Sequence, residues 1–202
     1  MIIRLFISAV IGYCFGCIQS AYLLGRLVGK IDIREHGSGN AGASNVTSTL
    51  GLKYGVIVGL VDILKGTLAV LLVKWVYPEY PHLAYLSGLM AVIGHLFPFY
   101  LNFRGGKGVA TLAGMMFGVN WKLGVLFVLL VAVPAFVSDY IVAGSLTAFL
   151  ALPIVTYLRG YPIYLLILSL ILTAVCFYLH RGNIQRIIKG KELRIREVIF
   201  KK

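Results

Sequence analysis

Charged residues are scarce in this sequence, and acidic residues are the scarcest among them. Only 13% of the 202 residues are charged, and 7 Asp or Glu stand against 19 Lys or Arg, for a net charge of +12. Soluble proteins carry roughly 25% charged residues. With 59% of the chain hydrophobic, too few polar helix faces remain to coat a soluble core. The composition therefore argues against a soluble domain and indicates that lipid covers much of the apolar surface.

Groups of metal-binding residues are also missing. Cys14 and Cys17 form a CxxC, but they lie within an apolar run that has no second CxxC and no His nearby. We interpret them as small apolar helix residues and expect no metal and no cofactor. The positive charge lies between and after the apolar runs, so membrane topology explains much of it, and no nucleic acid is expected as a partner.

Long apolar runs are what the sequence has instead. A helix that crosses the bilayer core needs about 20 apolar residues. We predict an all-α polytopic membrane protein with about seven transmembrane helices in a single domain, 1–202. Five or six spans is the alternative, if two short runs pair or re-enter. The predicted spans are 2–28, 52–76, 82–101, 109–119, 123–137, 141–158 and 162–180.

The joints between these spans differ in charge. Odd-numbered joints and the tail, 181–202, hold most of the Lys and Arg residues. The even-numbered joints and the N-terminus hold only Arg4, Lys74, Lys122 and Arg159. Cytoplasmic loops carry the excess of Lys and Arg, so we expect the N-terminus outside and the basic tail in the cytoplasm.

The tail itself carries two patterns. Gly182 is predicted to end the last spanning helix. Ile184, Ile187 and Ile188 then have helical spacing, which predicts a short interfacial helix. Residues 193–196 alternate between apolar and basic side chains, which allows a short strand.

Two loops on the predicted cytoplasmic face are rich in glycine and in hydrogen-bond donors. In residues 36–45, small residues let successive N–H groups converge on an anion, and a following helix would aid that binding. In residues 102–108, we expect the glycines around Lys107 to expose N–H groups beside a point charge, which suits a phosphate. A flexible loop and simple topology charges are the alternatives. The P-loop spacing GxxxxGK[ST] is absent, so nucleoside triphosphate hydrolysis is not expected.

Ionisable and polar residues also occur inside the apolar runs. Asp62 and Lys65 lie on one helix face, and because such residues need a partner within a membrane, we expect them to pair. Ser145 within a spanning helix ordinarily bonds back to its own helix. His95 is either a hydrogen-bonded helix residue or a group that orients a substrate or the glycine-rich loop. His180 begins a polar cluster, 180–183, at the end of the last span.

Three motifs carry a resemblance that runs along nearly the whole chain. They read GSGNAGASN (37–45), GHLFPFYLNFRGGKGVAT (94–111) and HRGNIQRIIKGKE (180–192). They resemble the bacterial acyl-phosphate:glycerol-3-phosphate acyltransferase family, PlsY. The resemblance implies that a fatty acyl group moves from acyl phosphate to the sn-1 hydroxyl of glycerol 3-phosphate, giving lysophosphatidic acid and phosphate in phospholipid biosynthesis. It further implies a multi-pass protein of the bacterial inner membrane with its active site facing the cytoplasm.

Other acyltransferase signatures are absent, and this sequence departs from the family at a few positions. None of the four histidines has the Asp five residues on that marks soluble-type glycerolipid acyltransferases. The Asp-rich signature of CDP-alcohol phosphotransferases is missing as well. Arg104 stands where the family has Lys, and Asp139 and Val142 replace an Arg and a Ser of its third motif. Roles tied to those last two positions do not transfer.

We predict two sets of site residues. The catalytic set is Ser38, Lys107, Ser145, His180 and Asn183. The substrate-binding set is Gly37, Gly39, Asn40, Asn45, His95, Arg104, Gly105, Gly106, Gly108 and Arg181. The general base is left open between a phosphate oxygen of the substrate and His180 or His95.

The apolar helices are expected to hold the acyl tail, with Gly12, Gly16 and Gly25 leaving a groove for it. A transporter or flippase of a phosphorylated metabolite is the alternative function, because it too would place donors at helix breaks. The sequence has neither an internal repeat nor a polar cluster on the outer face, which disfavours that alternative. A lipid-binding scaffold without chemistry is a third reading.

Overall fold

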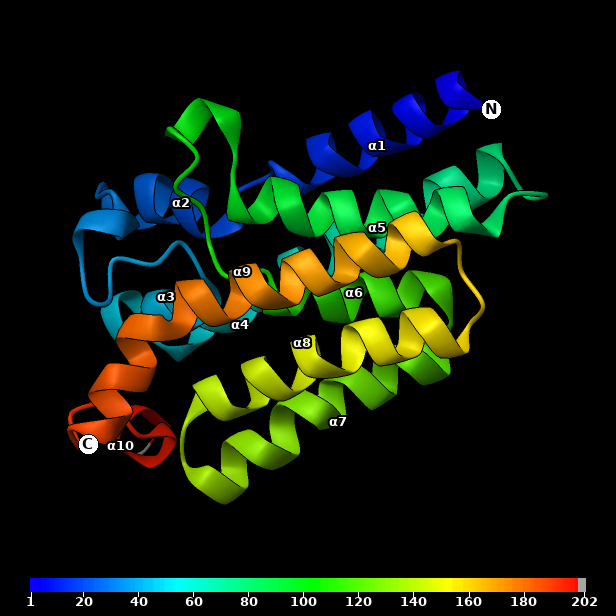
Figure 1. Ribbon diagram of the computed structural model, residues 1–202. Coiled ribbons are helices and arrows are strands. Elements are labelled where there is room, and N and C mark those ends of the chain that lie inside the picture. Colours follow the sequence, from blue (N-terminus) through cyan, green and yellow to red (C-terminus); the bar gives the residue numbers. More distant parts are fainter. Residues whose placement is uncertain (200–202) are drawn as a thin grey trace. The chain divides into compact units, whose positions relative to one another are not determined.

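The computed structural model describes residues 1–199, and every regular element within them is helical (Figure 1). The predicted all-α architecture is confirmed. The chain divides into two compact units, residues 1–124 and 125–202, which are described separately below. The single domain over 1–202 stays a prediction.

The first unit contains most of the helices. In chain order its elements are α1 (Ile2–Gly16), α2 (Ser20–Leu24), the π-helical turn η1 (Gly25–Gly29), the 3-10 turn η2 (Ile33–Glu35), α3 (Ala43–Leu50), α4 (Leu52–Val76), α5 (Pro81–Leu96), the 3-10 turn η3 (Phe99–Leu101) and α6 (Val109–Val119). Helix α7 (Trp121–Ser138) leads out of this unit. The second unit continues with α8 (Ile141–Leu158), α9 (Ile163–Ile188) and α10 (Ile195–Ile199).

Six helical segments among residues 1–199 are long and apolar enough to cross a membrane. They are Ile2–Gly29, Leu52–Val76, Pro81–Leu101, Trp121–Ser138, Ile141–Leu158 and Ile163–Ile188. Helix α6 is apolar but has only 11 residues. At 1.5 Å per residue it spans about 16 Å, roughly half of the hydrocarbon core. The count of seven spans and the orientation of the termini stay predictions.

The first predicted span, 2–28, is not one continuous helix. Helix α1 ends at Gly16, and the chain is non-helical at Ile18 and Gln19 before α2 begins. Side chains bind the backbone at this break, because Lys65 Nζ donates to the Ile18 carbonyl at 2.6 Å and Tyr100 Oη donates to the Cys17 carbonyl at 2.8 Å. Apolar composition gave no sign of these partners, so the uninterrupted helix was a wrong prediction.

Glycines of α1 allow it to lie directly against α5 (Figure 1). A Cβ added to Gly12 would overlap the backbone of Ser87, and one added to Gly16 would overlap the backbone of Ala91. This close approach of small residues four apart is typical of packed membrane helices. The predicted acyl-chain groove at Gly12 and Gly16 is therefore wrong, because α5 already fills that space. At Gly25 a Cβ would meet Ile33 Cβ at 3.3 Å, so little space is open there either.

The end of the chain also differs from the prediction. Helix α9 runs without interruption through Gly182 to Ile188, so Gly182 does not end it and residues 184–188 do not form a separate helix. Residues 195–199 form the short helix α10, so the strand suggested over 193–196 is absent as well. The Ile195 N–H donates to the Asp139 carbonyl at 2.9 Å, which holds this helix against the α7–α8 turn.

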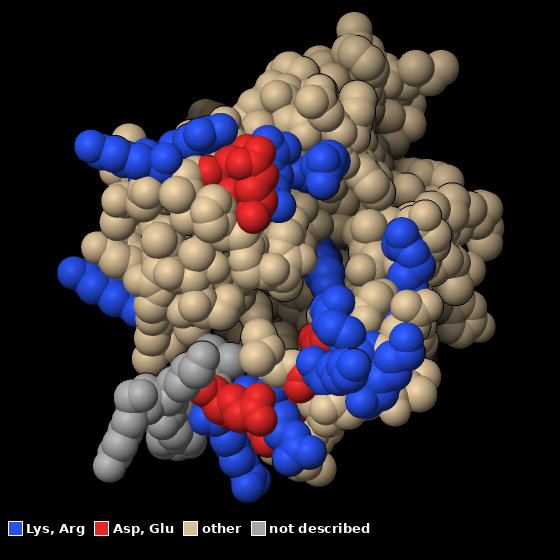
Figure 2. Space-filling view, turned by 90° about the vertical axis from the view of Figure 1, so that its left-hand side faces the viewer, with Lys and Arg blue, Asp and Glu red and all other residues tan. Residues whose placement is uncertain are grey.

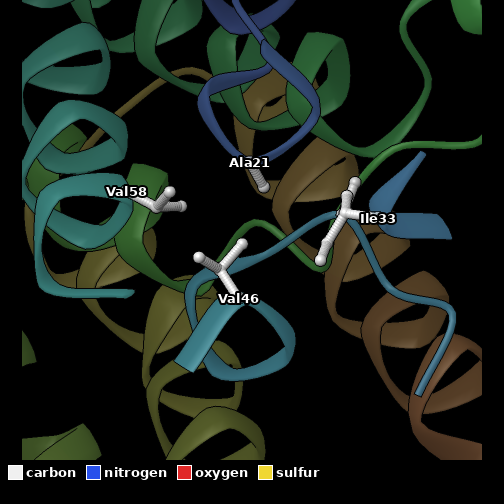
Figure 3. Packing of buried hydrophobic residues seen from close by; sticks show 5 residues of the cluster. Ala21, Ile33, Val46 and Val58 are labelled. Carbon is white, nitrogen blue, oxygen red and sulfur yellow. The ribbon is translucent and has the colours of Figure 1, made fainter. Parts of the chain in front are cut away.

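A small apolar cluster supports the polar loop of the first unit. Ala21, Ile33, Val46 and Val58 come from α2, η2, α3 and α4, and their side chains point toward one another (Figure 3). All four are buried, together with Ala41. The loop is thereby attached to the helices at both of its ends, and the polar residues between those ends are held on its outer side.

Candidate active site

Asn45 organises the first polar loop from within. Its side-chain Oδ1 accepts a hydrogen bond from the Ser38 N–H at 2.8 Å. Its Nδ2 donates to the carbonyls of Ile33 and His36 at 2.8 and 2.9 Å. Asn45 is 2% exposed, so its hydrogen bonds fix the shape of the loop from the inside. The structure thus gives Asn45 a positioning role within this loop.

The tip of the loop presents the residues predicted to bind phosphate. Gly37 and Gly39 have φ angles of +58° and +72°, a conformation that glycine adopts without strain. Ser38 and Gly39 are exposed and Asn40 is half-buried. The turn therefore holds Ser38 at the surface, while its backbone N–H donates to the buried Asn45 side chain.

Asp32 and Arg34 join this loop to the segment that follows α5. The Asp32 carboxylate accepts hydrogen bonds from the Arg34 guanidinium at 2.8 and 3.0 Å, and Arg34 Nη1 donates to the Leu101 carbonyl at 2.9 Å. Arg26 contacts the same carboxylate at 3.4 Å. These hydrogen bonds from Arg34 lower the pKa of Asp32 to about 2. Figure 2 shows that acidic side chains on the face in view lie among Lys and Arg rather than apart from them.

The glycine-rich loop is built differently from the prediction. The N–H groups of Gly105 and Gly106 donate to the carbonyls of Leu96 and His95, each at 3.1 Å. They are therefore not open to a phosphate, and the predicted exposure of these two N–H groups is wrong. A Cβ on Gly105 would overlap the His95 carbonyl, so this residue is small because the loop folds tightly over the end of α5.

Lys107 and Gly108 follow directly from this fold-back. Gly108 has a φ of +78° and forms the N-cap of α6, so the chain turns sharply after Lys107. Lys107 is half-buried and Arg104 is exposed. Lys107 therefore stands between two fixed points, the hydrogen-bonded Gly106 and the start of α6.

The two loops of the first unit lie against each other. A Cβ on Gly106 would come within 2.6 Å of the Ala41 carbonyl and would overlap His95 Nε2. Residue 41 belongs to the first loop, Gly106 to the second and His95 to the end of α5. The two loops are thus in contact within this unit, and His95 lies against Gly106.

A buried polar cluster lies under this junction. Lys65 Nζ is 2.7 Å from Asp62 Oδ1 and 2.7 Å from His95 Nδ1, and Ser20 Oγ donates to Asp62 Oδ1 at 2.8 Å. The expected Asp62–Lys65 pair is confirmed. Its extension to His95 and Ser20 was not predicted, because sequence spacing gives only contacts within one helix.

The second unit holds the remaining predicted residues. Ser145 is buried and its hydroxyl donates to the Ile141 carbonyl at 3.1 Å, the back-bond expected of a helix serine. Asn183 Nδ2 donates to Glu192 Oε1 at 2.5 Å. The Arg181 guanidinium lies 3.9 Å from the centre of the Tyr178 ring. Glu192, which no prediction singled out, also accepts from Arg186 Nε at 2.6 Å and so fixes the end of α9.

His180 has a defined orientation in α9. It is buried, and its Nδ1 lies 2.8 Å from the Cys176 carbonyl. A carbonyl oxygen only accepts, so this nitrogen carries the hydrogen and the neutral ring has its lone pair on Nε2. His180 therefore has the tautomer that a general base needs.

The residues predicted to bind phosphate are divided between the two units. Ser38 and Lys107 belong to the first unit, and His180 and Asn183 belong to the second. Among residues 1–199, no three His, Cys, Asp or Glu side chains lie close enough together to hold a metal ion. The described residues thus form an all-helical protein with long apolar helices joined by polar loops.

Comparison with known proteins identifies the family. The sequence profile of the glycerol-3-phosphate acyltransferase family matches residues 6–190. A glycerol-3-phosphate acyltransferase of Thermoanaerobacter pseudethanolicus is 37% identical over 189 residues, which cover 94% of each protein. The chain belongs to the glycerol-3-phosphate acyltransferase family.

Two crystal structures of the integral membrane glycerol 3-phosphate acyltransferase PlsY (YgiH) are similar to this chain. The glycerol 3-phosphate form superposes with a TM-score of 0.83 at 34% identity and covers 94% of both chains. The lysophosphatidic acid form superposes with a TM-score of 0.82 at 33% identity, over 97% of this chain and 98% of the other. The family indicated by the three sequence motifs, and with it the multi-pass membrane fold, is confirmed.

Proposed function

We propose that this protein transfers a fatty acyl group from acyl phosphate to the sn-1 hydroxyl of glycerol 3-phosphate. The hydroxyl oxygen forms the new ester bond, the bond from the acyl carbon to the phosphate oxygen breaks, and lysophosphatidic acid and inorganic phosphate leave. The reaction takes place at the cytoplasmic face of the bacterial inner membrane and begins phospholipid synthesis. Acyltransferase activity on glycerol 3-phosphate accords with the family to which the chain belongs.

The strongest support for the proposal is the similarity of this chain to two structures of a related acyltransferase. The relatives in the glycerol 3-phosphate and lysophosphatidic acid forms are similar to this chain over more than nine-tenths of its length. Glycerol 3-phosphate and lysophosphatidic acid are the acceptor and the product of the proposed transfer. The donor-rich loops of the first unit, joined at Ala41 and Gly106, supply the kind of groups that hold such phosphates.

The proposed reaction depends more on the positioning of the two substrates than on a strong catalytic acid or base. Acyl phosphate is a mixed anhydride, so phosphate is already a good leaving group. The protein must hold two anions together and align the hydroxyl with the acyl carbon, and these effects supply most of the acceleration. We assign to Lys107 the neutralisation of phosphate charge and to Ser38 a hydrogen bond to a phosphate oxygen.

The proton of the attacking hydroxyl needs an acceptor. His95 is unsuited to this role, because its Nδ1 faces the Lys65 ammonium at 2.7 Å. His180 keeps a lone pair on Nε2, since its Nδ1 donates to Cys176. The acceptor is therefore His180 or a phosphate oxygen of the substrate itself. His180→Ala decides between them, since substantial remaining turnover assigns the proton to the substrate phosphate.

The proposal is tested with purified protein in lipid vesicles, supplied with palmitoyl phosphate and radiolabelled glycerol 3-phosphate. Radiolabelled lysophosphatidic acid and an equal amount of inorganic phosphate are expected. Product formed from acyl-CoA but not from acyl phosphate would overturn the assignment of the donor. Absence of product with either donor would overturn the transfer itself.

A further inference from the structure

Two helices of the first unit, α4 and α5, bring three ionisable side chains together in the interior. Asp62 and Lys65 come from α4 and His95 from the end of α5, and each of the three is 3% exposed or less. The break after α1 adds the Ile18 carbonyl, which accepts from Lys65 Nζ at 2.6 Å. Such groups are costly within a membrane protein and are retained where they serve the function.

The hydrogen bonds of Lys65 define the state of His95. An ammonium group has three hydrogens, and Lys65 Nζ has three acceptors, Asp62 Oδ1 at 2.7 Å, His95 Nδ1 at 2.7 Å and Ile18 O at 2.6 Å. His95 Nδ1 must therefore accept, because Lys65 has only donors. The ring is then neutral and carries its hydrogen on Nε2. Asp62 balances the charge of Lys65, and Ser20 donates to the same carboxylate oxygen.

The other edge of the His95 ring meets the glycine-rich loop. A Cβ on Gly106 would overlap His95 Nε2 and lie 2.9 Å from Cε1, so this ring edge is packed against the Gly106 backbone. The Gly106 N–H donates to the carbonyl of the same histidine at 3.1 Å. Gln19 Nε2 donates to that carbonyl at 3.0 Å. Residue 106 is thus held by both the backbone and the ring of His95, immediately before Lys107.

We infer that Asp62, Lys65 and His95 form a positioning cluster that fixes the tautomer of His95 and, through Gly106, the place of Lys107 at the phosphate of glycerol 3-phosphate. None of the three touches the reacting atoms. The kinetic part of this inference rests on the proposed transfer, and its structural part does not. Stability alone does not explain the cluster, since apolar residues of similar volume replace buried ion pairs at no loss in many proteins.

The structural part is tested by nuclear magnetic resonance of the purified protein labelled with ¹⁵N-histidine. The chain has four histidines, and the signals of His95 are those missing from His95→Asn. We expect hydrogen on Nε2 of His95, unchanged between pH 6 and pH 8. A His95 ring that carries its hydrogen on Nδ1, or that titrates in this range, would overturn the inference whether or not the protein turns over substrate.

The kinetic part is tested with Asp62→Asn/Lys65→Met. This double variant removes both charges together, so no buried charge is left unpaired, and the amide oxygen of the new asparagine side chain still accepts from Ser20. We expect the KM for glycerol 3-phosphate to rise about tenfold, the effect of one displaced hydrogen bond, with kcat reduced less. The matched control is Thr67→Val, which removes hydrogen bonds to Ile63 and Gly114 from the same helix and should leave KM unchanged.

A folded double variant with unaltered KM would overturn the positioning role. If the double variant does not fold, two substitutions of His95 give the answer. His95→Asn keeps an acceptor near Nδ1 for Lys65 and removes the ring edge at Gly106, whereas His95→Gln places an amide N–H near the position of Nε2. We expect the KM to rise about tenfold in His95→Asn and clearly less in His95→Gln. Equal values of KM in both variants and the wild type would contradict the inference.

Discussion

Removal of the Asn45 side chain is expected to raise the KM for glycerol 3-phosphate more than any other single change in the first loop. Asn45 makes three hydrogen bonds of 2.8 to 2.9 Å, to Ser38 N, Ile33 O and His36 O. A neutral hydrogen bond contributes about 1 kcal/mol net. Asn45→Ala therefore weakens the ordered loop by about 3 kcal/mol, which corresponds to roughly 100-fold in KM if the whole cost falls on binding.

The assay is initial-rate kinetics in vesicles with glycerol 3-phosphate varied at saturating acyl phosphate. Asn45→Asp is the informative companion, since it keeps an acceptor for Ser38 N but turns a carboxylate toward two carbonyl oxygens. It should impair binding at least as much as Asn45→Ala. The control is Ser48→Ala, which removes one hydrogen bond from an exposed residue to the Asn45 carbonyl and should change KM by less than about twofold. A normal KM in folded Asn45→Ala would refute the role assigned to this loop.

Three further predictions concern Lys107, Asp32 and Gly16. Lys107→Ala should reduce kcat/KM by at least about 100-fold, because a charge-assisted contact to phosphate is worth roughly 3 kcal/mol. Lys107→Arg should recover part of the loss. Normal turnover in the alanine variant would show that Lys107 does not belong to the site. The pKa of Asp32 lies near 2, below its usual 3.8, so its contribution to stability is present above pH 4 and lost as the pH falls toward 2. Thermal unfolding in detergent should then show Asp32→Asn less stable than wild type at pH 7, with the two melting temperatures converging as the pH falls from 4 to 2. Gly16→Ala should unfold at a lower temperature than wild type, because overpacking against Ala91 lowers the free energy of unfolding by about 1–3 kcal/mol. Cys14→Ala, which changes an exposed residue of the same helix, should unfold at the same temperature as wild type.

The sequence was sufficient to predict the long helices and the two loops. The span 52–76 coincides with α4, and 141–158 coincides with α8. These runs are bounded by residues that interrupt apolar helices, namely Gly51, Tyr77, Tyr140 and Arg159. The motifs at 37–45 and 94–111 were also sufficient to indicate the family, which the profile match confirms.

Tertiary contacts determine where α9 ends and where the first span is interrupted, and local sequence patterns did not predict either feature. Gly182 in an α-helix costs about 1 kcal/mol relative to alanine, and the interactions of Asn183 and Arg186 with Glu192 offset that cost and allow α9 to continue. The break after α1 depends on Lys65 and Tyr100, which lie 47 and 83 positions from the carbonyls they bind. No local pattern predicts partners at such separations.

The fold of the glycine-rich loop could not be predicted from local sequence either. A run of glycines beside a lysine fits an open anion nest and a tight fold-back over a helix end equally well. The hydrogen bonds of Gly105 and Gly106 to Leu96 and His95 select the second arrangement. These hydrogen bonds fix the backbone directly before Lys107.

The most direct test of the proposed function is product formation in sealed vesicles that contain only this protein. With palmitoyl phosphate and radiolabelled glycerol 3-phosphate added together, we predict lysophosphatidic acid and inorganic phosphate in equal amounts, formed far more slowly by Lys107→Ala. Accumulation of unmodified glycerol 3-phosphate inside the vesicles without any lysophosphatidic acid would contradict the account and identify a transporter instead.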